Sequence, residues 1–301
     1  MDRNRVIGVD LGGTKILAAI VDREGTPHER VVRPTPTGSQ EEVLRGLEDA
    51  VEALRDDTIA AIGFGVPSRI DHAGGRAIGS VNIPLDGFPL RDRMRERFGL
   101  PAGLANDGNA ATFAEWRHGA GRGADDLAML TLGTGVGGGV VFGGNLYRGW
   151  AELGHLVVLA GGPPCQGICT GHGHLESLVS GHAADGVARE VLGEGTTARD
   201  LVERGHAGDE AAVEALASIG RLLGAGIGSI VNVFGVELVL VGGGFGSAAG
   251  DLILGPALEV ARVESLTPAR DRLRIIPAAL GPDAGVLGAA LVAFEALDGA
   301  R

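Results

Sequence analysis

The segment VIGVDLGGTKILAAIVD, residues 6–22, decides the fold. An apolar run ends at Asp10, the turn GGTK follows at residues 12–15, and a second apolar run begins at Ile16. Short apolar runs on either side of a glycine turn predict two buried strands joined by a tight connection. We therefore expect the chain to open with a strand, a glycine turn and a second strand.

A second segment of the same kind is AMLTLGTGVGGGVVF, residues 128–142. It has the same order of strand, glycine turn (residues 133–139) and strand, although few residues are shared, so we interpret the chain as two structurally repeated halves. Gly133, Gly135 and Gly138 also satisfy G-x-G-x-x-G, the dinucleotide-binding fingerprint. That fingerprint needs a helix directly afterwards, whereas a strand pattern follows here, so the pattern disfavours a dehydrogenase.

The rest of the chain alternates helical and strand patterns, which predicts an α/β architecture. The helices are expected at residues 40–55, after Asp107, near 175–192, at 209–233, after Asp251 and at 285–297, and the further strands at 59–66, 237–241 and 273–278.

Composition excludes several classes of protein. The chain has 301 residues, 45% of them hydrophobic, which suffices for two domains with their own cores. A net charge of -12 without a long basic run argues against a nucleic-acid partner. Residues 1–11 are too short an apolar run for a signal peptide, and residues 222–236 fit a buried helix better than a membrane span. We expect a cytoplasmic protein with no membrane partner.

Asp10 stands directly before a turn whose glycines let the backbone approach a ligand closely. Such a turn binds phosphate oxygens through its N–H groups, while the carboxylate holds a hydrated Mg²⁺. The surface is acidic, so bound phosphates need local devices of this kind, together with one lysine, Lys15. The structural alternative is a plain hairpin turn with an aspartate at the strand end.

Four further motifs, taken in order along the chain, resemble the ROK family of repressors, open reading frames and sugar kinases. They are ANDGNAA (105–111), ELGH (152–155), VGGG (241–244) and LGPDAGVLGAA (280–290). The resemblance covers nearly the whole chain. It implies a ribonuclease H-like, actin-like ATPase fold of two α/β domains with a cleft between them.

The implied smaller domain comprises residues 1–117 together with a C-terminal helix at about 287–301, and the larger comprises residues 118–286. In the family the aspartate that matches Asp107 is the general base for the sugar hydroxyl. Phosphoryl transfer independently needs a group that orients the nucleophile and takes its proton. Asp107 is equally suited to cap the following helix, and the two roles are compatible.

The resemblance also implies two sets of binding residues. Those expected to bind the sugar, in addition to Asp107, are Asn82, Asn106, Glu152, His155 and Glu176. Those expected to bind ATP and Mg²⁺ are Asp10, Gly12, Gly13, Thr14, Lys15, Thr134, Gly135, Gly243 and Gly244.

His155, Cys165, Cys169 and His174 form H-x9-C-x3-C-x4-H, which suits a tetrahedral structural zinc ion. The family pattern is C-x-C-G-x-x-G-C-x-E, and this chain departs from it twice. Three residues separate the two cysteines, and His174 replaces the last cysteine. His172 is a competing ligand, and a loop without metal or a reversible thiol pair is the alternative. Two cysteines exclude a disulfide framework.

The resemblance implies ATP-dependent phosphorylation of a hexose, with glucose first by family frequency, and a homodimer or homotetramer. N-acetylmannosamine, N-acetylglucosamine, fructose and allose remain alternative substrates, and polyphosphate an alternative donor. Only Trp150 and Ala151 separate the motif LYRG (146–149) from Glu152, where the family has a longer segment. A sugar-binding member without catalysis is therefore a further alternative. Repressor members of the family carry a helix-turn-helix before the first strand. Because the first strand is expected to begin close to Met1 here, the sequence disfavours a repressor.

Overall fold

The computed structural model describes residues 4–79 and 83–299, so the predicted sugar ligand Asn82 lies outside the described residues. The chain forms two compact units. Unit 1 comprises Met1–His118 and Asp283–Arg301, and unit 2 comprises Gly119–Pro282.

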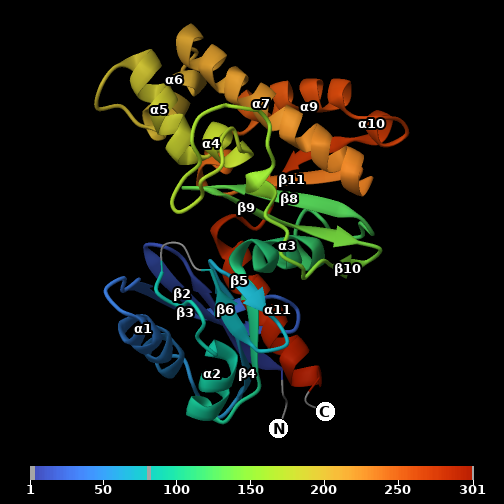
Figure 1. Cartoon of the computed structure of the whole chain (residues 1–301). Coiled ribbons are helices and arrows are strands. Elements are labelled where there is room, and N and C mark those ends of the chain that lie inside the picture. The colour runs from blue at the N-terminus through green and yellow to red at the C-terminus, as the bar shows by residue number, and fades with distance from the viewer. Residues whose placement is uncertain (1–3, 80–82, 300–301) are drawn as a thin grey trace. The chain divides into compact units, whose positions relative to one another are not determined.

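Unit 1 is built on a five-stranded sheet in the order β3-β2-β1-β4-β7 (Figure 1). The first three strands are antiparallel, and β4 and β7 run parallel to β1. The register places Asp10 of β1 beside Gly65 of β4, and Gly65 beside Ala105 of β7. The carboxyl ends of these three strands therefore share one edge. The strands of unit 1, including a small hairpin of β5 and β6, are β1 (Arg5–Leu11), β2 (Lys15–Asp22), β3 (Pro27–Pro34), β4 (Ile59–Val66), β5 (Arg69–Asp71), β6 (Arg76–Ile78) and β7 (Ala102–Asn106).

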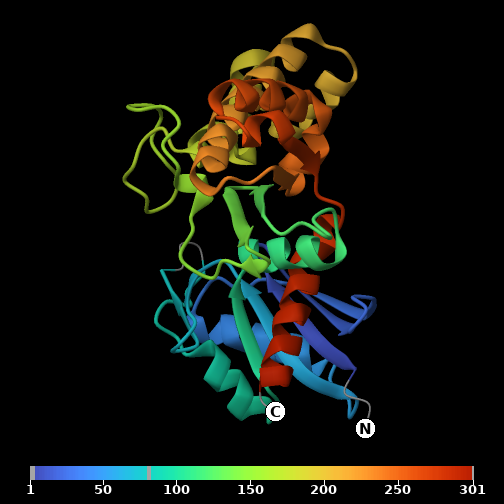
Figure 2. The same cartoon turned by 90° about the vertical axis from the view of Figure 1, so that its right-hand side faces the viewer.

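Helices cover both faces of this sheet. On one face α1 packs Val43 and Leu47 among the apolar side chains of β1 and β4. On the other face α11, the last helix of the chain, lies along the strands (Figure 2). The helices of unit 1 are α1 (Gln40–Glu52), α2 (Leu90–Phe98), α3 (Asp107–His118) and α11 (Ala284–Gly299).

A row of glycines lets α11 approach the sheet closely. Gly8, Gly63 and Gly103 occupy neighbouring register positions on β1, β4 and β7. A Cβ atom at Gly63 would overlap the carbonyl oxygen of Ala289, and one at Gly103 would overlap that of Val292. The backbone of the helix therefore rests directly on the backbone of three strands, a contact that side chains would prevent.

Unit 2 repeats the arrangement of unit 1. Its sheet has the order β10-β9-β8-β11-β12, with β8, β9 and β10 antiparallel and β11 and β12 parallel to β8. The predicted repeat of two halves and the α/β class are thus confirmed. The strands of unit 2 are β8 (Leu127–Leu132), β9 (Val136–Phe142), β10 (Asn145–Leu146), β11 (Leu238–Gly242) and β12 (Arg274–Pro277).

The glycine turn of unit 2 is shorter than the sequence suggested. Only residues 133–135 form the turn, because β9 begins at Val136 and includes the next three glycines. A Cβ atom at Gly138 would overlap the carbonyl oxygen of Met129 on β8. Glycine is used here for close packing of strands and not for a turn.

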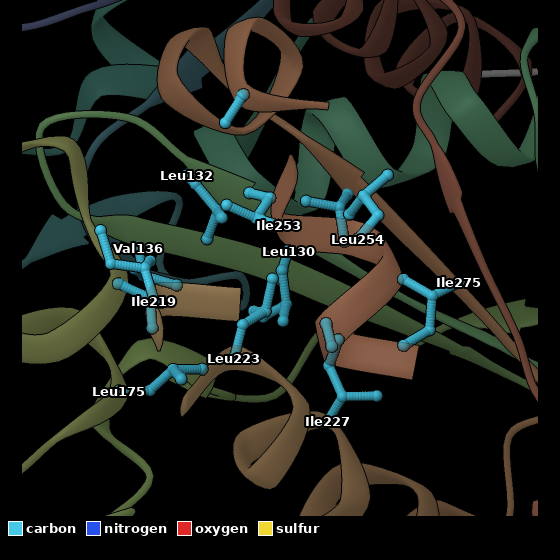
Figure 3. Close-up of a cluster of buried hydrophobic side chains, with 14 of the residues drawn as sticks. Leu130, Leu132, Val136, Leu175, Ile219, Leu223, Ile227, Ile253, Leu254 and Ile275 are labelled. Carbon is cyan, nitrogen blue, oxygen red and sulfur yellow. The ribbon is translucent and has the colours of Figure 1, made fainter. Parts of the chain in front are cut away.

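The core of unit 2 lies between its sheet and two long helices, α7 (Glu210–Phe234) and α9 (Asp251–Glu264), which pack along each other. Figure 3 shows Leu130 and Leu132 of β8 in the same cluster of buried side chains as Leu223 and Ile227 of α7. Among the described residues α7 alone is long and apolar enough to cross a membrane, and 56% of its most apolar window is buried in the unit. The expectation of a buried helix at 222–236 is therefore confirmed.

The helix predicted near residues 175–192 is two helices. They meet at Ser180, whose side chain accepts a hydrogen bond from the Ala183 N–H and so starts α5. The α-helices of unit 2 are α4 (Leu175–Val179), α5 (Gly181–Leu192), α6 (Ala198–His206), α7 (Glu210–Phe234), α8 (Gly244–Ala249), α9 (Asp251–Glu264) and α10 (Ala269–Arg272). Two 3₁₀ turns, η1 (Leu153–His155) and η2 (Gly281–Asp283), complete the secondary structure.

Candidate active site

Asp107 lies where β7 ends and α3 begins, at the carboxyl edge of the unit 1 sheet. Its Oδ1 accepts hydrogen bonds from Asn106 Nδ2 at 3.0 Å and from the Gly108 N–H at 2.8 Å. The second oxygen, Oδ2, accepts no hydrogen bond from another residue in the part of the chain that the structure describes. Burial raises the pKa of Asp107, against the opposing effect of these hydrogen bonds. One oxygen is held in place while the other can accept a proton, as a general base requires.

Asn106 holds Asp107 in position. Its Nδ2 donates to Asp107 Oδ1 and also lies 3.3 Å from the Ser68 carbonyl oxygen. Its Oδ1 accepts the Asn109 N–H at 3.0 Å, so Asn106 caps α3, a role that the sequence suggested for Asp107. Because both amide hydrogens are engaged, Asn106 serves first to orient the neighbouring carboxylate.

Asp10 lies one residue before the end of β1, and its carboxylate occupies space that Gly285 leaves open. A Cβ atom at Gly285, in the first turn of α11, would lie 2.5 Å from Asp10 Oδ2, and one at Gly65 would lie 3.9 Å from Oδ1. Burial, and then the charge of Asp107, raise the pKa of Asp10 to about 7, while Lys15 opposes the shift. A divalent cation would favour the ionised form, and a carboxylate is a ligand that Mg²⁺ prefers. The residues present therefore fit Mg²⁺.

The turn at residues 12–15 is anchored at both ends. The Gly12 N–H donates to the Lys15 carbonyl oxygen at 2.9 Å. Thr35, just after β3, donates from its hydroxyl to the Gly12 carbonyl at 2.6 Å and from its N–H to the Thr14 carbonyl at 3.0 Å. The residues at the tip, Gly13, Thr14 and Lys15, are exposed. The turn is rigid at its base and accessible at its tip, as a phosphate-binding loop must be.

In unit 2 two of the predicted nucleotide residues, Thr134 and Gly244, line a pocket of about 740 Å³, and Gly135 and Gly243 are their neighbours in the sequence. Gly243 has φ +82° and follows β11, and a Cβ atom there would lie 2.5 Å from the Leu132 backbone nitrogen, so the position requires glycine. Gly244 has no atom within 4 Å of where its Cβ would be, and it lines the pocket with Thr134. The pocket is large enough for a nucleoside. Sequence reasoning did not find its other polar lining residues, which are His182, Asp185, Arg199 and Glu203.

The four predicted metal ligands gather in one cluster, with their ligand atoms all within 4.8 Å of one another. His155 Nδ1 lies 3.1 Å from His174 Nδ1 and 3.6 Å from Cys165 Sγ, and Cys169 Sγ lies 3.6 Å from His174 Nδ1. Tetrahedral ligands at zinc bond lengths are separated by roughly 3.3–3.8 Å. The competing ligand His172 is exposed and is not part of the cluster.

A bound cation would change the protonation state of the thiols in the cluster. Burial raises the pKa of Cys165 to about 11, so the thiolate that binds metal forms only when a cation stabilises it. The donor set therefore fits a closed, structural zinc site of two cysteines and two histidines.

Two of the predicted sugar ligands lie close to this cluster. His155 belongs to it, and Glu176 has Oε1 at 3.8 Å from Cys165 Sγ. The other oxygen of Glu176, Oε2, accepts the Val136 N–H at 2.9 Å, a contact that the sequence did not predict. Glu152 is exposed and directly precedes η1. Unit 2 thus brings Glu176 and His155 together with the metal cluster.

The comparisons with known proteins agree with this geometry. The family model described as "ROK family" matches residues 6–296. The chain belongs to the ROK family.

Two curated ROK relatives and one solved structure illustrate the similarity. Glucokinase of Thermotoga maritima is 34% identical over 99% of this chain and 100% of its own length. N-acetylmannosamine kinase of Shigella flexneri is 33% identical, over 96% of this chain and 98% of its own. The structure of a ROK family glucokinase from Streptomyces griseus in complex with glucose and AMPPNP has 34% identity and a TM-score of 0.84, covering 97% of this chain and 99% of that one. The predicted actin-like ATPase fold is therefore confirmed.

The roles of some residues can be seen only in the folded structure. Gly285 lies in the motif at residues 280–290. Its role is to leave room for the Asp10 carboxylate, and this role depends on a contact between residues that are 275 positions apart in the sequence. Thr35 and Ser68 carry no motif and were missed. A further pocket in unit 1, of about 1040 Å³, is lined by parts of α2, β7 and α11 and includes none of the predicted site residues.

Proposed function

We propose that this ROK protein transfers the γ-phosphoryl group of ATP to a hydroxyl of a hexose, with glucose as the first candidate. The observation that carries the proposal is the state of Asp107, whose Oδ1 is held by Asn106 and Gly108 while Oδ2 is left to accept a proton. The similarity to glucokinases over nearly the full length of both chains supports the same activity.

In unit 1, Asp107 takes the proton of the attacking sugar hydroxyl, and Asn106 keeps the carboxylate oriented. Asp10 would hold Mg²⁺, which supplies neutralisation of charge on the transferred phosphoryl group. Gly12 closes the base of the turn through its N–H bond to the Lys15 carbonyl oxygen. Gly13 and Thr14 present backbone N–H groups to phosphate oxygens, and Lys15 adds a positive charge beside them.

In unit 2, Thr134 and Gly135 bind phosphate, and Gly243 and Gly244 leave room for the nucleoside in the pocket of about 740 Å³. Glu152, His155 and Glu176 bind sugar hydroxyls, for which carboxylate and imidazole groups are suitable partners. A structural zinc ion would hold His155 next to Glu176. Asn82 remains a sequence-based candidate for the sugar site.

Several finer points belong to the same proposal. N-acetylmannosamine is the leading alternative substrate because of the similarity to a kinase of that sugar. N-acetylglucosamine, fructose and allose are further candidate substrates, and polyphosphate is a further candidate donor. The short connection of Trp150 and Ala151 before Glu152 is where the sugar pocket differs from the family pattern. We further propose a cytoplasmic homodimer or homotetramer, with domains divided near residues 117 and 287.

The test is ADP release with a panel of hexoses, with ATP or polyphosphate as donor, for the wild type and Asp107→Asn. The variant should lose about 10²–10⁴-fold in kcat with sugar binding retained, because it loses proton abstraction and little contact area. Asp57→Asn, an exposed residue of the same unit, serves as the matched control and should turn over normally. Near wild-type turnover by Asp107→Asn would refute the base. Sugar binding without turnover of any hexose would favour a binding protein.

A further inference from the structure

The segment that carries the metal cluster, residues 155–174 and here called the metal loop, is connected to the glycine turn of unit 2 by two routes. The first runs through Glu176, which lies two residues after the end of the loop. Its Oε1 faces Cys165 Sγ at 3.8 Å, and its Oε2 accepts the Val136 N–H at 2.9 Å. A Cβ atom at Gly135 would overlap Oε2, so the glycine admits the carboxylate to the backbone of the turn.

The second route runs through Gln166, which lies between the two cysteines. Its Nε2 donates to Ser180 Oγ at 2.8 Å. Ser180 is completely buried and caps α5 by accepting the Ala183 N–H at 3.1 Å. The next residue, Gly181, donates its N–H to the Gly133 carbonyl oxygen at 2.7 Å. Through Ser180 and Gly181, the position of Gln166 therefore influences the position of Gly133, the first residue of the glycine turn.

The two routes reach opposite ends of the same turn. Gly133 is held from α5, and Val136 is held by Glu176. Between them lies Thr134, which lines the pocket of about 740 Å³ together with Gly133 and Gly181. The shape of the nucleotide-binding turn thus depends on two side chains whose positions are set by the metal loop.

We propose that Gln166 and Glu176 are positioning residues through which metal bound by the cluster orders the nucleotide-binding turn. The inference rests on the proposed function, since it takes the pocket of unit 2 as the nucleotide site. Metal and nucleotide then strengthen each other's binding by the same factor, because coupling between two ligands is reciprocal. The metal loop serves the phosphoryl donor as well as the sugar.

The test measures binding of the non-hydrolysable analogue AMPPNP by calorimetry, without sugar, to zinc-loaded protein. Gln166→Leu keeps all four metal ligands but removes one of the two hydrogen bonds that the buried Ser180 hydroxyl accepts, and should weaken AMPPNP binding about five- to twentyfold. Its glucose KM should change less than about twofold, since Gln166 is not among the residues assigned to the sugar. Zinc content, measured by atomic absorption, should remain at one ion per chain.

Ile168→Ala is the matched control, because Ile168 lies on the same loop between the same cysteines and is 72% exposed. It should bind AMPPNP like the wild type. Chelation of zinc from the wild type should weaken AMPPNP binding more than Gln166→Leu does, because it disturbs both routes. Chelation should weaken AMPPNP binding to the variant by a smaller factor than to the wild type, because only the Glu176 route remains to be disturbed. AMPPNP should in turn tighten zinc binding to the wild type by a larger factor than to Gln166→Leu.

The outcomes separate this inference from the function on which it rests. If the wild type binds AMPPNP and neither chelation nor Gln166→Leu changes that affinity, the linkage is wrong and the kinase proposal stands. If both weaken glucose and AMPPNP equally, the loop is a general scaffold and the specific linkage is again wrong. If the zinc-loaded wild type binds no AMPPNP, both proposals fall.

Discussion

The two glycine turns, at residues 12–15 in unit 1 and 133–135 in unit 2, have equivalent places between the first two strands of their sheets, but different structures support them. In unit 1 the turn stands beside a buried carboxylate, Asp10, for which the first turn of α11 makes room. In unit 2 the turn is held by Glu176 and by the start of α5. The shared topology fixes where a phosphate can bind, and the element packed behind each turn decides the chemistry available there.

The largest expected effect concerns the packing behind the unit 1 turn. Gly63→Ala places a methyl group on the Ala289 carbonyl oxygen, in backbone that has no flexible side chain to yield. We expect a loss of about 4 kcal/mol or more in the free energy of unfolding, measured by urea denaturation. Gly186→Ala in α5 of unit 2, where the nearest atom is the end of Arg189 at 4.0 Å, should instead gain up to about 1 kcal/mol. Equal effects would show that α11 is not packed on the sheet backbone.

The next effect concerns the charge beside that turn. The pKa of Asp10 in the folded protein, about 7, exceeds its ordinary value of 3.8, so the folded state binds more protons between these limits. Stability of the metal-free protein should therefore fall as pH rises from 4 to 7, by about 4 kcal/mol at most. Asp10→Asn should remove this dependence and be the more stable protein at pH 8, while losing turnover.

Urea unfolding in EDTA at pH 5 and pH 8 measures the difference. A wild type that gains stability over this range relative to Asp10→Asn would contradict the raised pKa. Addition of Mg²⁺ with nucleotide should restore stability to the wild type and not to the variant.

The third effect tests the support of the unit 2 turn. Cys169→Ser removes one of four ligands, and a metal that binds only the folded state stabilises it by about 3 kcal/mol at 100 times its Kd. We expect a corresponding loss of thermal stability and of bound zinc. His172→Ala, an exposed histidine outside the cluster, should keep both. If His172→Ala loses zinc instead, the ligand set is wrong.

The smallest effect concerns an ion pair of unit 1. Arg30 on β3 binds Asp283, just before α11, with two hydrogen bonds of 2.8 and 2.9 Å. Both side chains are partly exposed, so Arg30→Ala should cost less than about 1 kcal/mol, and less still in high salt. The single contact of Arg272 with Glu237 in unit 2, at 3.1 Å, should contribute even less. Calorimetry at low and high ionic strength compares them.

Much of the fold could be predicted from local patterns. Apolar runs identified β1, β4 and β11, and helical spacing identified α7 and α11. The edge strand β3 was missed because it is mostly exposed and carries charges, so it lacks the apolar alternation that marks a strand. The glycines after Val136 were read as a turn because glycine is rare within strands, and only the contact of Gly138 with Met129 explains them.

The sequence predicted which residues belong to the candidate site better than it predicted how those residues contact one another. Motifs indicated Asp107 and the four residues of the metal cluster. The structure brings the four cluster residues together. They could not indicate that Asn106 caps α3, or that Glu176 binds the turn through Val136, because such contacts depend on side-chain directions in the folded chain. The lining of the unit 2 pocket by α5 and α6 depends likewise on packing.

The placement of α11 has a consequence for the order in which the protein can form during translation. A Cβ atom at Gly8 on β1 would overlap the backbone of Val286 and Ala290 on α11, so these distant segments of the sequence are in direct contact. The core of unit 1 therefore stays incomplete on the ribosome until α11 has been synthesised. Unit 2 is one continuous segment, Gly119–Pro282, and can close its core earlier. The first strands to be made are among the last to be covered.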